Sequence, residues 1–280
     1  MRILLVGNAM DNFSGQPMST YEMAKEFSKE HDVSVCVLPG RWSDNILKRN
    51  LEKLGVKCIY NPMPEYDLII ASEWMPNVSG FKINIVRSEY VWETPIVGCD
   101  FYTCIRPSIQ DHIVEEHDIP KEKTMVLYNG VDRTRFKPQI KVPRDYELLI
   151  APCTIDNLRE RFLNHIIGTL NEKRVLHIYG EEKGADLIKS PYCRIFKPRF
   201  DMENVISQAD VVVGILLGRV NLEANACGIK SVIYNPETLE SEEFFLDDKT
   251  FDERHNIVNT CKNLLKIKYV EEEVYNTLVW

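Results

Sequence analysis

Short apolar runs recur along the chain, and each is followed by a turn and then by a stretch with apolar residues at helical spacing. The runs at residues 2–7, 33–38 and 147–151 are rich in Val, Ile and Leu. Continuous apolar runs of this length are typical of parallel strands that are buried on both faces. Because strands and helices alternate, the pattern predicts an α/β protein with parallel sheets.

The same pattern predicts the remaining elements. Further strands are expected at residues 57–60, 66–72, 82–87, 101–105, 124–128, 174–180, 192–197, 211–213 and 231–234. Helices are expected at residues 19–29, 45–54, 108–117, 201–209 and 221–227, with another that ends at 170 and a helical tail. Ser19, with Glu22 three residues later, forms a capping-box pattern, which places the start of the first helix at Ser19.

The segment 209–236 carries the strongest chemical signal, and its sequence is ADVVVGILLGRVNLEANACGIKSVIYNP. It is typical of a strand, a turn, a short helix and a second strand. Gly218 lies in the turn, where a residue without a Cβ is expected, and Gly228 is expected to end the helix. Open α/β sheets bind ligands outside the carboxyl ends of their strands, so Glu223 in the first turns of the helix is placed to face a ligand. Its carboxylate could accept hydrogen bonds from two hydroxyls, as a ribose requires; the alternative is a solvated glutamate that complements the helix dipole.

Two further positions are candidates for contacts with phosphate. The strand, loop, helix and strand at the amino terminus form a Rossmann-like opening that lacks the G-x-G-x-x-G pattern. Gly15 in this loop lets the backbone approach a ligand phosphate or an acceptor group, and an ordinary surface turn is the alternative. Arg159 or Arg161, near a helix start, could clamp a diphosphate through paired hydrogen bonds, and a surface arginine is the alternative.

Three strands of the first half end in polar residues. The tripeptides are Ser-Glu-Trp at 72–74, Arg-Ser-Glu at 87–89 and Arg-Pro-Ser at 106–108. The carboxyl ends of parallel strands lie along one edge of a sheet, so we expect that edge to form the wall of a cleft.

Composition narrows the functional classes. The 280 residues carry a formal net charge of −8, which argues against a nucleic-acid-binding protein because such proteins need a basic surface. Eight scattered cysteines follow no C-x-x-C or regular spacing, so neither a zinc site nor a disulfide framework is indicated. The amino terminus enters a strand at once and no apolar run approaches the ~20 residues that span a bilayer. We therefore expect a cytoplasmic protein.

Two predicted helices carry charged or metal-ligating residues that could either have a function or be ordinary surface residues. The helix at 45–54 is basic and amphipathic; such a face can make a peripheral membrane contact with anionic lipid, but a solvated face is the more common arrangement. His112 and Glu116 stand one turn apart on the helix at 108–117, and two residues without further ligands are interpreted as a surface pair.

The segment 137–146 has two prolines and alternating charges, which indicates a linker between two domains. The halves on either side both begin with a buried-type strand. The chain is therefore expected to form two similar α/β domains, at residues 1–140 and 141–280.

The order of these motifs resembles that of family 4 glycosyltransferases. Residues 127–138 contain Asn-Gly-Val-Asp followed by Phe and Pro, similar to the family's N-G-V-D-x-x-x-F-x-P segment. Residues 209–213 and 223–228 resemble the family's A-D-x-x-x and E-A-M-A-C-G signatures, and HIYGE at 177–181 lies where the family has a strand-to-glycine turn. The resemblance covers most of the chain. It implies the GT-B fold, in which two Rossmann-like domains with parallel sheets face a central cleft.

The resemblance also implies an activity. A family member transfers a sugar from a nucleotide-diphosphate donor to a hydroxyl acceptor with retained anomeric configuration, as a metal-independent hexosyltransferase without a cofactor. The first domain would bind the acceptor, which is a carbohydrate, a glycan or a lipid-linked molecule, and the second domain would bind the nucleotide-sugar donor.

Individual positions follow from the same resemblance. Glu223 matches the carboxylate that holds the nucleotide ribose, and Arg159, five residues after Thr154, matches the basic residue that faces the donor diphosphate. Arg159 and Glu223 are therefore the expected catalytic residues. The remaining residues expected to bind the donor are Gly15, Thr154, Gly180, Gly218 and Arg219.

The chain departs from the family pattern at three places. The paired glutamate of the family, eight residues before Glu223, falls on Ile215. The arginine of the second-domain phosphate site falls on Thr154, and the first-domain histidine is replaced by the tripeptide at 87–89. Nucleotide binding is thus better supported than any particular sugar chemistry.

These departures keep two other functions open. One is a GT-B protein with weakened catalysis that binds a nucleotide sugar or a protein partner, which Ile215 and Thr154 favour. The other is a nucleotide-sugar isomerase, which needs ionisable groups at the sugar; Glu73, Glu89 and His177 are the candidates.

Overall fold

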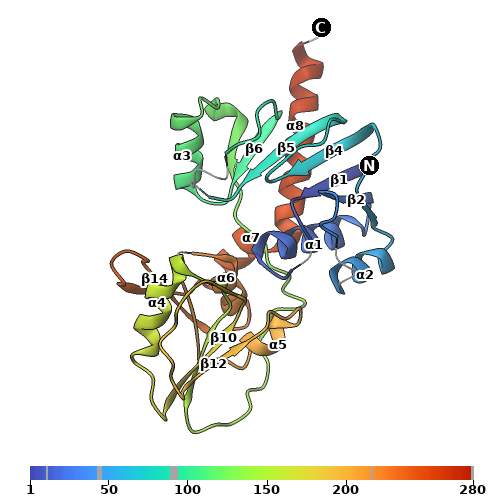
Figure 1. Cartoon of the computed structure of the whole chain (residues 1–280). Helices are drawn as coiled ribbons and strands as arrows, with labels where there is room; N and C mark the ends of the chain where they lie inside the picture. The colour runs from blue at the N-terminus through green and yellow to red at the C-terminus, as the bar shows by residue number, and fades with distance from the viewer. Residues whose placement is uncertain (11, 43–45, 89–93, 216, 279–280) are drawn as a thin grey trace. The chain divides into compact units, whose positions relative to one another are not determined.

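The computed structural model describes residues 1–10, 12–42, 46–88, 94–215 and 217–278, with side-chain surroundings up to residue 269. The chain divides into two compact units, which can be followed in Figure 1. Unit 1 comprises Met1–Asn12, Gln16–Gly130 and Asp252–Trp280, and unit 2 comprises Phe13–Gly15 and Val131–Phe251.

Unit 1 is built on a parallel sheet. Within the described residues the sheet has seven strands in the order β3-β2-β1-β4-β5-β6-β7, and every pair of neighbours is parallel. The strands are β1 (Arg2–Gly7), β2 (Asp32–Val37), β3 (Lys57–Ile59), β4 (Glu65–Ala71), β5 (Ser79–Val86), β6 (Phe101–Cys104) and β7 (Thr124–Val126). The helices of this part of the chain are α1 (Gly15–Phe27), α2 (Ile46–Lys53), α3 (Pro107–Glu116), the 3₁₀ turn Lys121–Lys123 and the C-terminal α8 (Ile257–Leu278).

Unit 2 has a second sheet, with the order β12-β10-β8-β13-β14-β15 in the described part of the chain. Its strands are β8 (Glu147–Ala151), β10 (Arg174–Tyr179), β12 (Cys193–Phe196), β13 (Val211–Ile215), β14 (Lys230–Tyr234) and β15 (Ser241–Phe244). Only the β14–β15 pairing in this sheet is antiparallel. A small parallel pair, β9 (Ile155–Asp156) and β11 (Glu182–Lys183), lies outside it. The helices are α4 (Asn157–Ile167), α5 (Met202–Ile206) and α6 (Arg219–Ala226), and α7 (Asp248–His255) follows β15.

Both sheets have the same doubly wound topology. If β8, β10, β12, β13, β14 and β15 are numbered from one to six, their order in the second sheet is 3-2-1-4-5-6. The first sheet has the same order from β3 to β6. This is the Rossmann order, in which the direction of winding reverses beside the first strand. The reversal lies between β1 and β4 in unit 1 and between β8 and β13 in unit 2. A ligand is expected at the carboxyl ends of these strands.

The core of unit 2 shows why its strands read as continuous apolar runs. Leu148 and Ile150 of β8 join one buried cluster, whereas Leu149 and Ala151 join another. Successive side chains of a strand point to opposite faces, so each face of the sheet has its own core. A strand covered on both faces needs apolar residues at every position, and this explains the sequence pattern.

The units differ from the predicted domains in two places. Val131 and Phe136 are fully buried in the core of unit 2, so the second unit begins before the predicted boundary at 140/141. Residues 252–280, predicted to belong to the second domain, group with unit 1. The segment 137–146, predicted as a linker, has no regular structure and belongs to unit 2.

The predicted strands and helices are present, with ends displaced by a few residues, but the capping box is wrong. Helix α1 begins at Gly15, and Ser19 and Glu22 are buried within it. Asn45, the predicted start of the second helix, lies outside the described residues, and α2 is described from Ile46. Gly228 has a φ of +69°, which confirms the predicted helix stop after α6. Among the described helices, none is long and apolar enough to cross a membrane.

Candidate functional site

The candidate site is the carboxyl edge of the sheet in unit 2. Strands β8, β10 and β13 are parallel, so the loops that follow them leave from the same edge. Helix α4 begins after β8, and α6 begins after β13. Six of the seven predicted site residues lie on these loops and helix starts, on either side of the β8–β13 reversal: Thr154, Arg159, Gly180, Gly218, Arg219 and Glu223.

Glu223 forms an ion pair within α6. The Nε atom of Arg219, one helical turn earlier, donates to Oε1 of Glu223 at 2.7 Å. The two side chains are only 8% and 11% exposed, respectively, so neither is a solvated surface group. The alternative of a solvent-facing glutamate is therefore wrong. The carboxylate is held in one arrangement at the end of the sheet where ligands bind.

The start of α6 is fixed by Asn221, which the sequence interpretation missed. Its Oδ1 accepts a hydrogen bond of 3.1 Å from the backbone N–H of Gly218, and its Nδ2 donates to the hydroxyl of Ser231 on β14. Asn221 is fully buried, so these bonds replace those it would make with water. In the sequence, an asparagine three residues after the turn glycine Gly218 is a recognisable signal for such a cap.

The predicted reason for Gly218 is not supported. Its φ of −117° is open to any residue, and the nearest atom to an added Cβ would be Asn221 Oδ1 at 3.9 Å. Gly180 is the position where a Cβ is excluded, because it would lie 1.7 Å from the carbonyl oxygen of Cys153. The loop after β10 therefore packs directly on the loop after β8, beside Thr154, whose Cα would lie 3.4 Å from that Cβ.

Arg159 lies in the first turn of α4 and is engaged with the helix cap. Asp156 accepts a 3.0 Å hydrogen bond from the backbone N–H of Arg159 through Oδ1, and its Oδ2 forms an ion pair with the guanidinium. The Arg159 side chain is 30% exposed, so it remains accessible from solvent. Arg161 instead donates to the carbonyl of Glu237 at 2.8 Å.

Two of the three departures from the family pattern, at Thr154 and Ile215, lie at the same edge. Thr154 is half-buried in the loop after β8, and Ile215 is the last residue of β13. Ile215 packs against the apolar cluster under α4. Beside Thr154, burial raises the pKa of the Cys153 thiol to about 12, a direction that Asp156 reinforces and Arg159 opposes.

The carboxyl edge of the sheet in unit 1 is polar, as predicted. Arg87, directly after β5, donates from Nε to the hydroxyl of Ser72 after β4 at 3.2 Å and from Nη1 to Oδ1 of Asn129 at 3.4 Å. Trp74 donates to the carbonyl of Gly7, the last residue of β1, at 2.9 Å. Glu89 lies outside the described residues.

Gly15 is the one predicted site residue that lies away from these loops in the sequence. It is the first residue of α1, it is exposed, and an added Cβ would meet no atom within 4 Å. The surroundings of Gly15 therefore neither require a glycine nor exclude contact between its backbone and a ligand.

The Asn-Gly-Val-Asp motif has a structural role in each unit. In unit 1 a Cβ on Gly130 would lie 2.7 Å from the Cα of Ile257, so α8 packs directly on this glycine. In unit 2, Val131 is fully buried and Asp132 accepts hydrogen bonds from the N–H and hydroxyl of Thr134 at 2.9 and 2.6 Å. The motif is explained by packing and turn formation.

Two other predicted candidates lie elsewhere. His177 is in the middle of β10, where its ring packs edge-on against Phe196, and burial together with Arg194 and Arg144 lowers its pKa. His112 packs against the ring of His117, and no group of three or more His, Cys, Asp or Glu side chains able to hold a metal occurs among the described residues.

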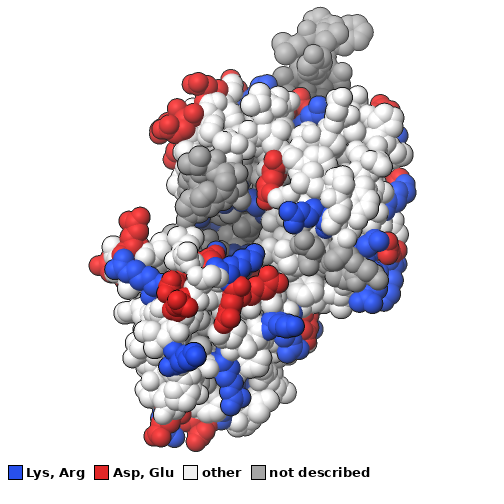
Figure 2. All heavy atoms as spheres, viewed as in Figure 1, with Lys and Arg blue, Asp and Glu red and all other residues white. Residues whose placement is uncertain are grey.

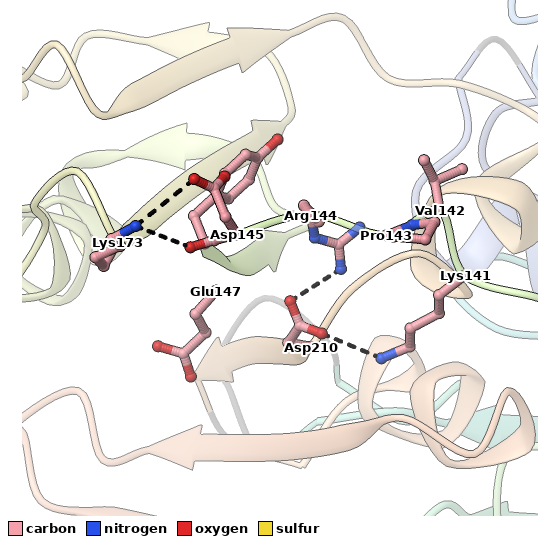
Figure 3. Close-up of a pocket in the computed structure, with 9 residues that line it drawn as sticks. Lys141, Val142, Pro143, Arg144, Asp145, Glu147, Lys173 and Asp210 are labelled. Atoms are coloured by element: carbon pink, nitrogen blue, oxygen red, sulfur yellow. Dashed lines mark hydrogen bonds and ion pairs between the residues drawn. The ribbon is translucent and has the colours of Figure 1, made fainter.

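A cavity of about 450 Å³ lies at the opposite, amino edge of the sheet in unit 2. Figure 3 shows Arg144 and Lys141 pointing toward Asp210, and Lys173 pointing toward Asp145. Asp210 also accepts the backbone N–H of Leu148 at 2.9 Å, so this carboxylate ties three parts of the unit together. Its partners are all structural, and ligands of doubly wound sheets bind at the other edge. The carboxyl edge therefore remains the candidate functional site.

Charged side chains of both signs lie on the face of the molecule that Figure 2 shows. Figure 2 shows acidic and basic side chains intermingled on the visible face. A protein that binds nucleic acid needs a concentrated basic patch, so this face has no such character.

The search against protein-family models found no match, and no curated protein matches this sequence. Solved structures do match. Anabaena HepE in complex with UDP-glucose has a TM-score of 0.71 and 14% identity, and the match covers 95% of this chain and 99% of that chain. WaaG, a glycosyltransferase involved in lipopolysaccharide biosynthesis, has a TM-score of 0.62 and 13% identity over 83% and 80% of the two chains.

The galactosyltransferase WaaB of the lipopolysaccharide outer core has a TM-score of 0.61 and 11% identity, over 97% and 100% of the two chains. These are similarities of fold at low sequence identity. Together with the two doubly wound sheets, they confirm the fold class: this chain is an α/β protein with the GT-B fold.

Proposed function

We propose that this protein is a glycosyltransferase that moves a sugar from a nucleotide-diphosphate sugar to a hydroxyl acceptor. The observation that carries the proposal is Glu223, a buried, paired carboxylate at the carboxyl edge of a doubly wound sheet. The two oxygens of a carboxylate can accept hydrogen bonds from the two adjacent hydroxyls of a ribose. HepE, which shares the fold over 95% of this chain, binds UDP-glucose, and this supports a nucleotide sugar as donor.

In the proposed reaction the bond between the sugar and the diphosphate breaks, and negative charge grows on the leaving nucleoside diphosphate. Arg159 and the backbone N–H groups at the start of α4 take up this charge, in the role that a divalent cation has in other transferases. The ion pair with Asp156 holds Arg159 at the helix start until the diphosphate arrives. Gly180 and Thr154 lie on the same loops. The acceptor oxygen bonds to the anomeric carbon from the face that the diphosphate leaves, which retains the configuration, and the hydroxyl proton passes to the departing diphosphate.

The acceptor would be a carbohydrate, a glycan or a lipid-linked molecule bound by unit 1. Ser72, Arg87 and Asn129 form a polar group at the carboxyl edge of that unit. Hydroxyl and amide groups of this kind can hydrogen-bond to sugar hydroxyls. Cytoplasmic localisation and a peripheral membrane contact through α2 remain parts of the same proposal.

A second function is favoured by two specific residues. Ile215 and Thr154 stand at the carboxyl edge where a second carboxylate and an arginine are expected in family 4. Without these groups the protein could bind a nucleotide sugar and react slowly with it. Such a protein would act as a binding protein for the nucleotide sugar or for a protein partner.

The proposal is tested first by ligand binding. Wild-type protein is screened by thermal shift against UDP, GDP, ADP and their sugars, and the stabilising nucleotide is titrated by calorimetry. Binding raises the melting temperature by mass action, so at least one nucleotide should stabilise the protein. Glu172→Ala, an exposed glutamate in the turn before β10, is the matched control for Glu223→Ala.

Catalysis is tested on the donor that binds. Transfer to oligosaccharide and lipid-linked acceptors, with hydrolysis of the donor as a second readout, separates an enzyme from a binding protein. Turnover with a retained anomer supports the proposal. Tight donor binding without turnover or hydrolysis supports the binding protein, and a failure to bind any nucleotide overturns both.

A further inference from the structure

Arg219 stands at a helix position where helix stability does not favour an arginine. It is the first residue of α6, and positive charge at the amino end of a helix opposes the helix dipole. The order of the pair is also the less favourable one, since a cation that precedes its carboxylate by four residues stabilises a helix less than the reverse. Burial of both side chains adds a desolvation penalty that an ion pair offsets only in good geometry.

The ion pair instead affects the charge and the orientation of the Glu223 carboxylate. Glu223 is nearly buried, and an isolated buried carboxylate is disfavoured in its charged form. The 2.7 Å contact with Arg219 Nε favours the ionised state and fixes the direction of the side chain. An ionised carboxylate accepts hydrogen bonds at both oxygens, whereas a protonated one must donate at one of them. Both ribose hydroxyls can donate to the ionised form, whereas one of them must accept from the protonated form.

We infer that Arg219 is the positioning residue for Glu223: it keeps the carboxylate ionised and oriented so that both ribose hydroxyls of the donor can bind. The inference rests on the proposed function, since it names how the same site recognises the ribose. Arg219 acts through Glu223, and the diphosphate is left to Arg159 and α4. Loss of Arg219 therefore removes recognition of the ribose hydroxyls specifically.

The test compares two ligands that differ only in those hydroxyls. UDP and 2′,3′-dideoxy-UDP, or the matching guanosine or adenosine pair if the wild type prefers it, are titrated by calorimetry. The wild type should bind the dideoxy compound about tenfold or more weakly, the scale of lost hydrogen bonds to a charged group. In Glu223→Gln and Arg219→Met this ratio should fall toward one, and Arg219→Lys should restore a part of it.

The double variant Arg219→Met/Glu223→Gln distinguishes a role through Glu223 from a direct contact between Arg219 and the ligand. It also guards against misfolding, because it leaves neither charge of the pair buried alone. It should bind UDP as Glu223→Gln does. The exposed pair Lys48–Glu52 on α2 has the same spacing and charge order, so Lys48→Met is the matched control and should keep the wild-type ratio.

Three outcomes overturn the inference. Arg219→Met with the wild-type ratio shows that Glu223 needs no positioning. A double variant that binds UDP much more weakly than Glu223→Gln shows that Arg219 contacts another part of the ligand. A wild type that binds no nucleoside diphosphate removes the proposed function, whereas the first two outcomes leave it standing.

Discussion

The carboxyl and amino edges of the sheet in unit 2 both hold arginines paired with carboxylates, but the pairs differ in what they join. At the carboxyl edge, Arg219–Glu223 and Arg159–Asp156 are four and three residues apart, each within one helix start. At the amino edge, Arg144 and Lys141 pair with Asp210, more than 60 residues away. Local pairs shape a helix end, whereas distant pairs tie the chain together.

This difference separates function from stability. A local pair is already close in the unfolded chain and joins no distant segments, whereas the pairs at the amino edge hold together segments more than 60 residues apart. The amino edge also holds the cavity, yet its charged groups are engaged in holding the segment 140–144 against residues 208–210. Substitutions at the amino edge should reduce stability, and substitutions at the carboxyl edge should reduce ligand binding.

The largest effect on stability is expected at Gly180, where the backbones of two loops of the carboxyl edge are in direct contact. Gly180→Val places a Cβ 1.7 Å from the carbonyl oxygen of Cys153, so the loops after β8 and β10 must separate. Overpacking of this kind costs about 3 kcal/mol or more. Urea denaturation measures the change, and a variant with wild-type stability would contradict the packing.

Asp210→Asn should reduce stability by about 1–3 kcal/mol and leave nucleotide affinity unchanged. It weakens the pairing with Arg144 and the hydrogen bond from Leu148, while partial exposure of the carboxylate limits the loss. Asp145→Asn at the same cavity is the control, because Asp145 is exposed and its ion pair should contribute less than about 1 kcal/mol. If Asp210→Asn lost nucleotide binding without losing stability, the amino edge would have the binding role that is assigned here to the carboxyl edge.

The effect of Asp210 should depend on pH. Burial raises the pKa of this carboxyl, but the hydrogen bonds from Leu148 and Arg144 lower it by more. The pKa of Asp210 therefore lies below its ordinary value of 3.8. A lowered folded-state pKa means that the stabilisation is complete above 3.8 and disappears as the pH falls through the folded value. The stability difference between wild type and Asp210→Asn should therefore shrink below about pH 4. A difference that stays constant from pH 7 to pH 3 would show that the charge of Asp210 is not involved.

Arg159→Ala should lower turnover by about a hundredfold and donor affinity by less than about tenfold, because the charge on the leaving diphosphate grows during the reaction. Steady-state kinetics and calorimetry give the two numbers. Arg161→Ala is a control on the same helix, since Arg161 contacts the carbonyl of Glu237. Equal losses of turnover and affinity in Arg159→Ala would indicate ground-state binding alone.

The smallest effect is expected for Gly218→Ala. The backbone of Gly218 suits any residue, and an added Cβ meets its nearest atom at 3.9 Å. The change in unfolding free energy should stay within about 0.5 kcal/mol. A large loss of stability would show that the start of α6 is more constrained than its φ and ψ angles indicate.

The sequence predicted what depends on local information. Continuous apolar runs identified the strands, and the alternation with helices indicated two parallel sheets. A glycine after the predicted helix indicated its end, and Gly228 ends α6 in a left-handed conformation. The i, i+4 spacing of Arg219 and Glu223 is also local, and it could have predicted the ion pair that the structure contains.

The rest depends on which core each residue joins. Ser19 and Glu22 fit a capping box, but tertiary packing buries them within α1. The predicted boundary at 140/141 could not show that Val131 and Phe136 belong to the core of unit 2 or that residues 252–280 group with unit 1. Asp210 belongs to the Ala-Asp motif at 209–213, but its role in joining Lys141, Arg144 and Leu148 depends on contacts between distant segments.

The central claim is that the carboxylate of Glu223 holds the nucleotide of the donor, and one calorimetric titration tests it most directly. The nucleoside diphosphate preferred by the wild type is titrated into Glu223→Ala and into the control Glu172→Ala. The account predicts a loss of about 1–3 kcal/mol of binding free energy in the first variant, the scale of a buried hydrogen-bonding group left unpaired, and wild-type affinity in the second. Wild-type affinity in a folded Glu223→Ala variant would contradict it.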